Sequence, residues 1–187
     1  MPHLVYRLRP EEYIRYRAHL LALDETSRYT RFGYAITDEM IHRLCDRFEA
    51  NPREHKIFVI EDADLNVIAA GHIALEGKET ELAFSVLKEY RQQGMGSSLM
   101  KRCLEWCQNR NIQGGCMVCL STNVAIKRLA SKHGVLVNDG PETLANITIP
   151  SANPVSVFSE VLDSNLARAD HLGKIQRKFV SSLYNVV

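Results

Sequence analysis

The segment Arg91-Gln92-Gln93-Gly94-Met95-Gly96 has residue types and a spacing that could bind an anion. The β-branched and aromatic run 81–87 before it predicts a strand, and the periodic run from Ser97 onward predicts a helix. The N–H groups of such a loop and of the first helical turn point the same way, and the helix dipole adds partial positive charge there. Because Gly94 and Gly96 lack a Cβ atom, a pyrophosphate could approach their backbone closely. The alternative is an ordinary turn in which the glycines serve only the backbone geometry.

Two common nucleotide-binding loops do not fit this segment. A dinucleotide-binding fingerprint needs a third glycine and a P-loop needs Gly-Lys-Ser/Thr, and both are missing here. A second motif follows the expected strand 116–120, with Asn123, Ile126, Leu129 and then Gly134-Val135 at regular spacing. Two motifs in this order are far more specific than either one alone.

Together these motifs resemble the acyl-CoA loop Arg-x-x-Gly-x-Gly and the segment Asn-x-x-Ala-x-x-Leu-Tyr-x-x-x-Gly-Phe of the GNAT superfamily. GNAT proteins are acetyl-CoA-dependent N-acetyltransferases, and the resemblance is clear over residues 56–135. Shorter similarities point to the protein-lysine acetyltransferase branch of that superfamily. They are the strand pattern Glu81-x-Ala83-Phe84-x-Val86, the segment 27–32 and the pair Leu129-Ala130.

The resemblance implies that acetyl-CoA is the co-substrate, and no metal is expected beside it because of the cysteine placement described below. In that fold two adjacent parallel strands, here 80–87 and 116–120, separate after a bulge, and acyl-CoA lies in the gap. Its pantetheine amides would pair with strand backbone like an added strand. The residues implied for cofactor binding are Phe84, Ser85, Val86, Gln92, Gln93, Gly94, Met95, Gly96, Ser97 and Asn123.

The implied reaction is attack of a primary amine on the thioester, with the acceptor a small molecule or a protein lysine. A lysine amine has a pKa of about 10.4, so a general base must neutralise it. Glu81 matches the position of the family's frequent catalytic glutamate and is the candidate base, with Glu76 and Glu79 as lesser candidates. A solvated strand residue is the alternative for Glu81. A backbone N–H near Val86 could stabilise the oxyanion.

One departure from the family pattern concerns the general acid. The usual tyrosine of the Leu-Tyr pair is Ala130 in this chain, so protonation of the leaving thiolate by a side chain is in doubt. A non-catalytic acyl-CoA sensor of the same fold therefore stays open as an alternative function. Two alternatives stay open for one group of residues, which could line the acceptor entrance or simply pack a helix connection: Arg28, Tyr29, Arg31, Phe32 and Tyr34. His72 is taken as a lone histidine.

Composition agrees with an ordinary globular enzyme. The 187 residues are 45% hydrophobic and 24% charged, with a formal net charge of +1. Such a balance supplies no general attraction to nucleic acid or to an anionic membrane surface. Since no apolar run approaches the roughly 20 residues of a membrane helix, we expect a cytoplasmic transferase.

The five cysteines do not predict a metal site. Cys103 and Cys107 share the apolar face of an expected helix, whereas Cys116 and Cys119 point to opposite sides of an expected strand. They are best explained as small, reduced core residues.

The expected fold is mixed α/β, a GNAT-like fold with a mostly antiparallel sheet of six to seven strands and one splayed parallel pair. Expected strands cover residues 4–8, 56–61, 67–75, 80–87, 116–120, 136–138 and 143–149. Expected helices cover 11–23, 37–48, the run after the glycine loop, and 123–133, while 24–34 is expected to be a connection.

Residues 1–150 are expected to form the acetyltransferase domain, and residues 151–187 a separate amphipathic helical extension. Its apolar residues recur near every 3.5 positions, and Gly173 interrupts the repeat. The extension could pack on the domain or form a homodimer with a second copy. A helix lying on a membrane surface is a further alternative, disfavoured because acidic residues dilute its basic character.

Overall fold

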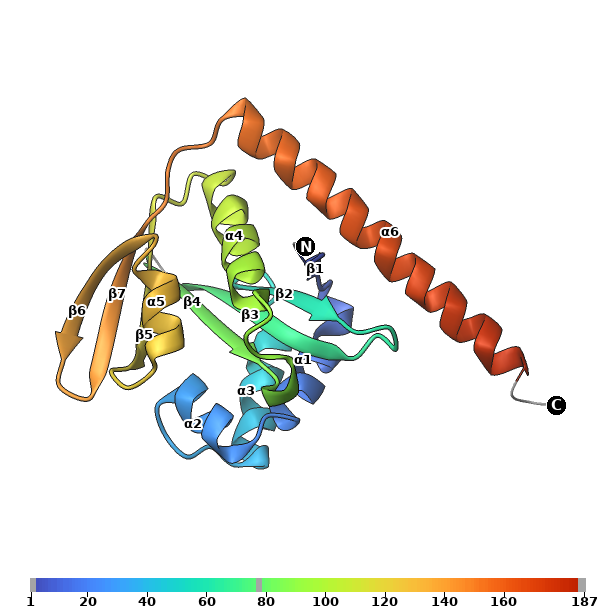
Figure 1. Ribbon diagram of the computed structural model, residues 1–187, viewed down its shortest axis with the longest axis horizontal. Helices are drawn as coiled ribbons and strands as arrows, with labels where there is room; N and C mark the ends of the chain where they lie inside the picture. Colours follow the sequence, from blue (N-terminus) through green and yellow to red (C-terminus); the bar gives the residue numbers. More distant parts are fainter. Residues whose placement is uncertain (1–2, 77–78, 185–187) are drawn as a thin grey trace.

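A seven-stranded sheet forms the centre of the computed structural model, which describes residues 3–76 and 79–184 (Figure 1). The strand order is β1-β2-β3-β4-β5-β7-β6, in which β4 and β5 are parallel and the other neighbours antiparallel. This confirms the expected mixed sheet with one parallel pair. The strands are β1 (Tyr6–Arg7), β2 (His55–Glu61), β3 (Val67–Glu76), β4 (Glu79–Val86), β5 (Gly114–Leu120), β6 (Gly134–Asp139) and β7 (Glu142–Thr148).

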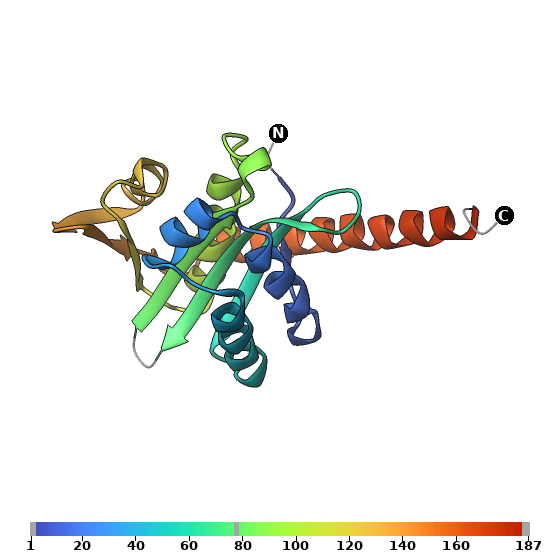
Figure 2. The ribbon, with the colours of Figure 1, turned by 90° about the horizontal axis from the view of Figure 1, so that it is seen from below.

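Helices cover both faces of the sheet, and each face has its own apolar core (Figures 1 and 2). On β2, Ile57 and Val59 pack under α1 and α3, while Phe58 and Ile60 belong to the core under α4. This alternation follows from the two-residue period of a strand. The helices are α1 (Tyr13–Leu21), α2 (Glu25–Phe32), α3 (Asp38–Ala50), α4 (Met95–Gln108), α5 (Val124–Ala130) and α6 (Pro154–Tyr184), with short 3-10 helices η1 (Pro10–Glu12) and η2 (Lys88–Tyr90).

The segment expected to be a connection, residues 24–34, instead contains α2. Asp24 caps this helix by accepting a hydrogen bond from the Ser27 N–H at 3.0 Å, and Gly33 ends it with a φ of 79°. The prediction was wrong because α2 is short and polar and its one buried residue is Ser27, so the run of apolar residues that usually identifies a helix is missing there. Other elements keep their type with shifted ends: the first strand shortens to β1, and the helix expected at 123–133 ends at Ala130.

The parallel pair diverges almost at once, and this divergence shapes the site. Among the described residues, only Glu81 and Cys116 pair across β4 and β5, so the part of β4 after Glu81 has no strand partner on that side. At the closed end, a Cβ atom on Gly115 would lie 2.9 Å from the Thr80 carbonyl oxygen, which explains the glycine there. The bulge expected where the parallel strands separate is absent from their described residues, because the registers of β4 with β3 and of β5 with β7 are continuous. A register shift lies instead between Ile60 and Glu61 of β2.

The C-terminal segment is one long helix, α6, which Gly173 does not interrupt (Figures 1 and 2). The side of α6 that faces the domain is largely polar. His171 is buried, stacks on Tyr6 at 4.1 Å between ring centroids, and its Nδ1 lies 2.9 Å from Glu61 Oε2. Glu160 accepts hydrogen bonds from Asn109 and Arg110.

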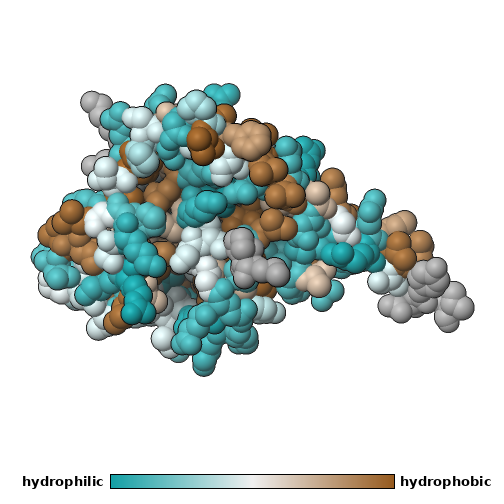
Figure 3. Space-filling view, turned by 45° about the horizontal axis from the view of Figure 1, so that its top comes forward, coloured by the Kyte–Doolittle hydropathy of each residue, from teal (hydrophilic) through white to brown (hydrophobic). Residues whose placement is uncertain are grey.

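Apolar side chains of α6 lie on the opposite side and are exposed, as the space-filling view shows along the helix (Figure 3). Phe158 is 70% and Phe179 63% exposed, and Leu162, Leu172 and Leu183 are about half exposed or more. Surface helices usually bury their apolar side, so α6 has the reverse arrangement. Within the described residues, no helix is both long and apolar enough to cross a membrane.

We expect Gly115→Ala to destabilise the fold by about 1–3 kcal/mol, because the new methyl group meets backbone that can move only if β4 and β5 separate. Gly114→Ala is the matched control, since its Cβ atom would lie at an ordinary 3.6 Å from the Ile147 carbonyl oxygen. Urea unfolding of both variants measures the difference. Equal stability of the two variants would contradict a tight contact at this end of the strand pair.

Candidate functional site

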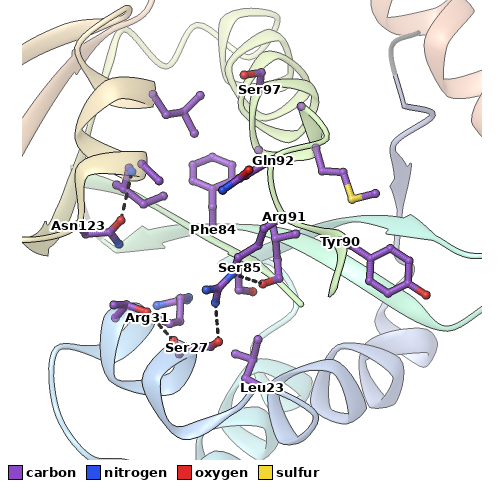
Figure 4. Close-up of a pocket in the computed structure, with 18 residues that line it drawn as sticks. Leu23, Ser27, Arg31, Phe84, Ser85, Tyr90, Arg91, Gln92, Ser97 and Asn123 are labelled. Atoms are coloured by element: carbon purple, nitrogen blue, oxygen red, sulfur yellow. Dashed lines mark hydrogen bonds between the residues drawn. The ribbon is translucent and has the colours of Figure 1, made fainter. Parts of the chain in front are cut away.

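A cavity of about 410 Å³ opens where β4 and β5 separate, beside the loop that leads into α4 (Figure 4). Its walls come from α2, the end of β4, the loop, the first turn of α4, and α5. The floor includes Phe84 and Leu129, whereas Arg31, Arg91 and Asn123 supply polar groups at the sides. A long ligand with an apolar arm and an anionic end fits this distribution of side chains.

The glycine loop has the backbone geometry expected of an anion site. Gln92 and Gly94 have φ angles of 63° and 82°, and Gly94 is the N-cap of α4. No side chain in the described part of the chain caps this helix, so the N–H groups of its first turn stay available to a ligand. A Cβ atom on Gly94 would meet nothing within 4 Å, whereas one on Gly96 would lie 3.7 Å from Leu129. The open space therefore lies over Gly94.

The edge of β4 presents backbone N–H groups to the cavity. The Leu87 N–H donates to the Ile68 carbonyl of β3, and N–H groups alternate along a strand. The N–H groups of Phe84 and Val86 therefore point away from β3, toward the gap before β5. An extended ligand could hydrogen-bond there as a further strand would.

Nine of the ten residues that the sequence suggested for cofactor binding line this cavity. They are Phe84, Ser85, Val86, Gln92, Gly94, Met95, Gly96, Ser97 and Asn123. Gln93 is not among the lining residues, and its carbonyl oxygen lies 2.8 Å from His3 Nε2. The Met95 side chain is mostly packed into the core, and Asn123 Oδ1 already accepts the Ile126 N–H of α5 at 3.3 Å.

Sequence reasoning missed the polar group that joins the loop to α2. Arg91 Nη2 donates to Ser27 Oγ at 2.5 Å, and its Nε lies 3.4 Å from the Val86 carbonyl oxygen (Figure 4). Ser27 Oγ in turn donates a hydrogen bond to the Asp24 carboxylate. This bond and the one from the Ser27 N–H lower the pKa of the Asp24 carboxyl. The first residue of the glycine motif is Arg91, so the sequence did contain a signal for this contact.

A buried histidine behind the cavity was also missed. His19 Nδ1 lies 2.9 Å from the Val67 carbonyl oxygen and so must donate, which leaves Nε2 to accept the Ser85 hydroxyl at 2.8 Å. Burial lowers the pKa of His19 to about 4, so the ring is neutral near pH 7. Ser85 is held in the cavity wall by this hydrogen bond.

A second cavity of about 300 Å³ lies on the side of β4 that faces α2 and α3. The predicted base, Glu81, lines this cavity and not the first one, and its side chain is exposed. The side chains of Glu76 and Glu79 lie outside the described part of the structure. Arg31 and Thr30 line both cavities, so the two spaces meet beside α2.

Residues of the expected acceptor entrance divide between the second cavity and other contacts. Phe32 and Tyr34 line the cavity, while Arg28 pairs with Asp38 on α3 at 2.5 Å. His72 is not a lone histidine, because its Nε2 lies 3.2 Å from His55 Nδ1. Burial, with a smaller contribution from the Arg31 charge, lowers the pKa of His72 well below its usual value.

Ala130 lies in the core and lines neither cavity, so its neighbour Leu129 is the one that faces the ligand space. The four cysteines Cys45, Cys103, Cys107 and Cys119 are buried, and burial raises the pKa of Cys107 to about 12. Among the residues described, no group of three or more His, Cys, Asp or Glu side chains could hold a metal ion.

Comparisons with known proteins agree with this geometry. A family model described as an acetyltransferase (GNAT) domain matches residues 53–134, which include the diverging strands and the glycine loop. Streptothricin acetyltransferase A of Bacillus subtilis is 24% identical over 74 residues, or 40% of this chain. That match spans 42% of the relative's length.

Solved structures share the fold at low sequence identity. The GNAT domain of S. lividans PAT superimposes with a TM-score of 0.61 at 17% identity, covering 77% of this chain and 89% of that one. The PaiA N-acetyltransferase of Thermoplasma acidophilum, solved in complex with coenzyme A, gives a TM-score of 0.58 at 12% identity, covering 79% and 99%. Since both identities are below 25%, these likenesses establish the architecture alone.

Proposed function

We propose that this chain, which belongs to the GNAT superfamily, is an N-acetyltransferase that moves an acetyl group from acetyl-CoA to a primary amine. The observation that carries the proposal is the single Glu81–Cys116 pairing between β4 and β5, which leaves an open strand edge beside a glycine loop. The similarity to the lysine-acetyltransferase branch, like the cytoplasmic location, stays a prediction from the sequence.

The residues around the first cavity fit acetyl-CoA. The free N–H groups of Phe84 and Val86 suit the amides of the pantetheine arm, and the uncapped start of α4 at Gly94 suits the pyrophosphate. Arg91, exposed at the rim, adds positive charge near the anionic end. The side chain of Gln93 is the least supported of the predicted contacts, because it does not line the cavity.

When bound, acetyl-CoA supplies a thioester that is already activated, so the protein mainly aligns the reactants. We assign to Glu81 the removal of a proton from the amine, directly or through a water molecule. The amine nitrogen then bonds to the carbonyl carbon, the C–S bond breaks, and the sulfur keeps the electron pair. The N–H of Val86 is suited to stabilise negative charge on the carbonyl oxygen.

This chain lacks the general acid of the family motif, because alanine replaces the tyrosine. Ala130 is fully buried and outside the cavity, so neither its position nor its side chain serves the leaving group. A thiol has a pKa of about 8.5, which makes the thiolate a tolerable leaving group near neutral pH. We propose that the coenzyme A thiolate leaves without a dedicated proton donor from the protein. The alternative of a non-catalytic acyl-CoA sensor has no specific observation in its favour.

We further propose that residues 1–150 form the catalytic domain and that 151–187 form an extension through which two copies associate. The support is the reversed polarity of α6, whose exposed apolar side is about 46 Å long at 1.5 Å per residue. A stripe of this length is unusual on the surface of a monomer.

The charged side chains of α6 do not interrupt this stripe, because most of them are paired on the side that faces the domain. Glu160 pairs with Arg110, Asp163 with Lys101 and Lys174 with Asp170, and the Lys178 amine donates to a backbone carbonyl of the domain. A second copy of α6 presents the same uncharged stripe, so we propose that it is the occupant.

We expect Gly94→Ala to weaken binding of coenzyme A by about tenfold or more, because the methyl group enters the open space over the loop. Its positive φ also costs about 1–2 kcal/mol of stability. Gly140→Ala is the control: Gly140 has a φ of 58°, has open space around it, and lies in the turn between β6 and β7. Titration calorimetry should give a weakened affinity for the first variant only, and equal affinities would count against the loop as the pyrophosphate site.

We expect the protein to release free thiol from acetyl-CoA with at least one amine in a panel of small amines and lysine peptides. Glu81→Gln should lower kcat by about 100- to 10,000-fold with coenzyme A affinity unchanged, because the amine loses its base. The loss should shrink at high pH, where more of the amine is already neutral.

Glu89→Gln is the matched control for this experiment, since Glu89 is an exposed carboxylate of η2 that lines neither cavity. It should keep the rate of the unaltered protein. Coenzyme A binding without turnover of any amine would favour the sensor alternative, and absence of binding would overturn both functions.

We expect sedimentation at micromolar concentration to give the mass of a dimer, and Phe179→Glu, at an exposed residue of the stripe, to give a monomer. An unpaired carboxylate in a buried apolar stripe should weaken association by roughly 100-fold or more. Ser182→Glu adds the same charge to the last turns of α6 away from the stripe and should keep the dimer. A monomeric parent protein would refute the proposed pairing.

A further inference from the structure

The second cavity contains both signs of charge, and among the described residues none of these charges is paired with an opposite charge. Arg31 and Arg47 line it together with Glu81 and Glu142. Within the described ranges, no ion pair involves any of the four. Glu142 reaches over the end of α2, where its Oε1 would lie 3.6 Å from a Cβ atom on Gly33. These groups are therefore free to contact a ligand.

Arg31 is half-buried, whereas the other three are exposed, and its side chain hydrogen-bonds to the uncharged side chain of Tyr16. The Nε of Arg31 is buried without a hydrogen-bond partner, and its guanidinium carbon lies 4.9 Å from the centre of the Phe32 ring. The titratable groups that it influences in the interior are Tyr16, His19 and His72, all neutral near pH 7. A partly buried cation without a counterion is costly, so an anion bound beside Arg31 would be favoured.

The position of Arg31 indicates which part of the reaction that anion belongs to. Arg31 lines both cavities, so it lies where the acyl donor's space meets the space that contains Glu81 (Figure 4). The anionic end of the donor is expected at the glycine loop, beside Arg91. An anion that reaches Arg31 and Arg47 together must enter from the second cavity, on the acceptor side.

We propose that the acceptor is an amino-acid-like molecule, whose carboxylate binds Arg31 and Arg47 while its amine points toward Glu81. The inference rests on the proposed acetyltransferase function and narrows its substrate class. A guanidinium binds a carboxylate through two parallel hydrogen bonds, which gives both affinity and orientation. The volume of about 300 Å³ suits a small molecule of this kind.

The test compares each of the common free amino acids with its own carboxamide, in the thiol-release assay with acetyl-CoA. Each pair differs at the carboxylate while keeping an amine. We expect the best acid to exceed its amide at least tenfold in kcat/KM. Arg31→Gln should lower kcat/KM for that acid by roughly 10- to 100-fold, mainly through KM, and leave the amide unchanged. Arg31→Lys should recover part of the loss.

Arg43→Gln is the control, because Arg43 is an exposed arginine on α3, the helix of Arg47, and lines neither cavity. It should leave the acid-to-amide ratio intact. The proposal would be overturned if the amides were acetylated as fast as the acids, or if lysine peptides were the sole substrates. It would also be overturned if Arg31→Gln lowered kcat equally for the acids and the amides.

If coenzyme A binds but no amine is acetylated, calorimetric binding of the same pairs in the presence of coenzyme A decides the question. Selective binding of acids that Arg31→Gln abolishes would support the carboxylate site, while its absence would refute it. Failure of the acetyltransferase function itself is recognised separately, by the lack of coenzyme A binding.

Discussion

The site depends on one constraint, the close approach of β4 and β5 at one end and their separation at the other. Gly115 permits the approach, because any side chain there would collide with Thr80 backbone. After the Glu81–Cys116 pair the strands part, and polar backbone groups that a sheet would normally satisfy are left open. Those groups, together with the uncapped start of α4, make the gap a place where a polar, extended ligand replaces missing protein contacts.

Charge is distributed on the two sides of β4 in a way that separates two binding tasks. On one side, Arg91 and the loop amides provide positive potential at the far end of the first cavity. On the other, Arg31 and Arg47 share the second cavity with Glu81 and Glu142. Because the N–H groups of a strand lie in the plane of the sheet whereas its side chains project from the faces, β4 could contribute N–H groups to one ligand and the Glu81 carboxylate to another.

The sequence predicted the parts of the site that are local in the chain. The strand, the glycine loop and the helix after it are contiguous, so turn chemistry and periodicity identified them, and Asn123 was found by its spacing within a second motif. The contacts of Ser27 with Arg91 and of His19 with Ser85 could not be predicted, because they depend on how α1 and α2 pack over β4. Arg31 was predicted only as a candidate for the acceptor entrance. The helix α2 itself was missed since its caps, Asp24 and Gly33, lie in a polar stretch.

The side of α6 that packs on the domain could not be predicted from the sequence either. Its periodic apolar residues predicted a helix, but which side faces the domain is decided by partners far away in the sequence. His171 finds Tyr6 and Glu61, and Glu160 finds Arg110, so the polar side is the one that docks. An ordinary amphipathic pattern predicts the reverse, because apolar burial is the usual driving force for docking a helix.

The hydrogen bond between His19 and Ser85 links the cavity wall to acid tolerance. The pKa of His19 falls from about 6.5 in an unfolded chain to about 4 in the folded one, so folding favours the neutral ring. The neutral His19 ring makes its full contribution to the free energy of unfolding above pH 6.5, and this contribution is lost as the pH falls toward 4. At pH 5 the loss is about 2 kcal/mol. A protonated ring can no longer accept the Ser85 hydroxyl, so mild acid loosens the ligand wall and the interior of the domain together.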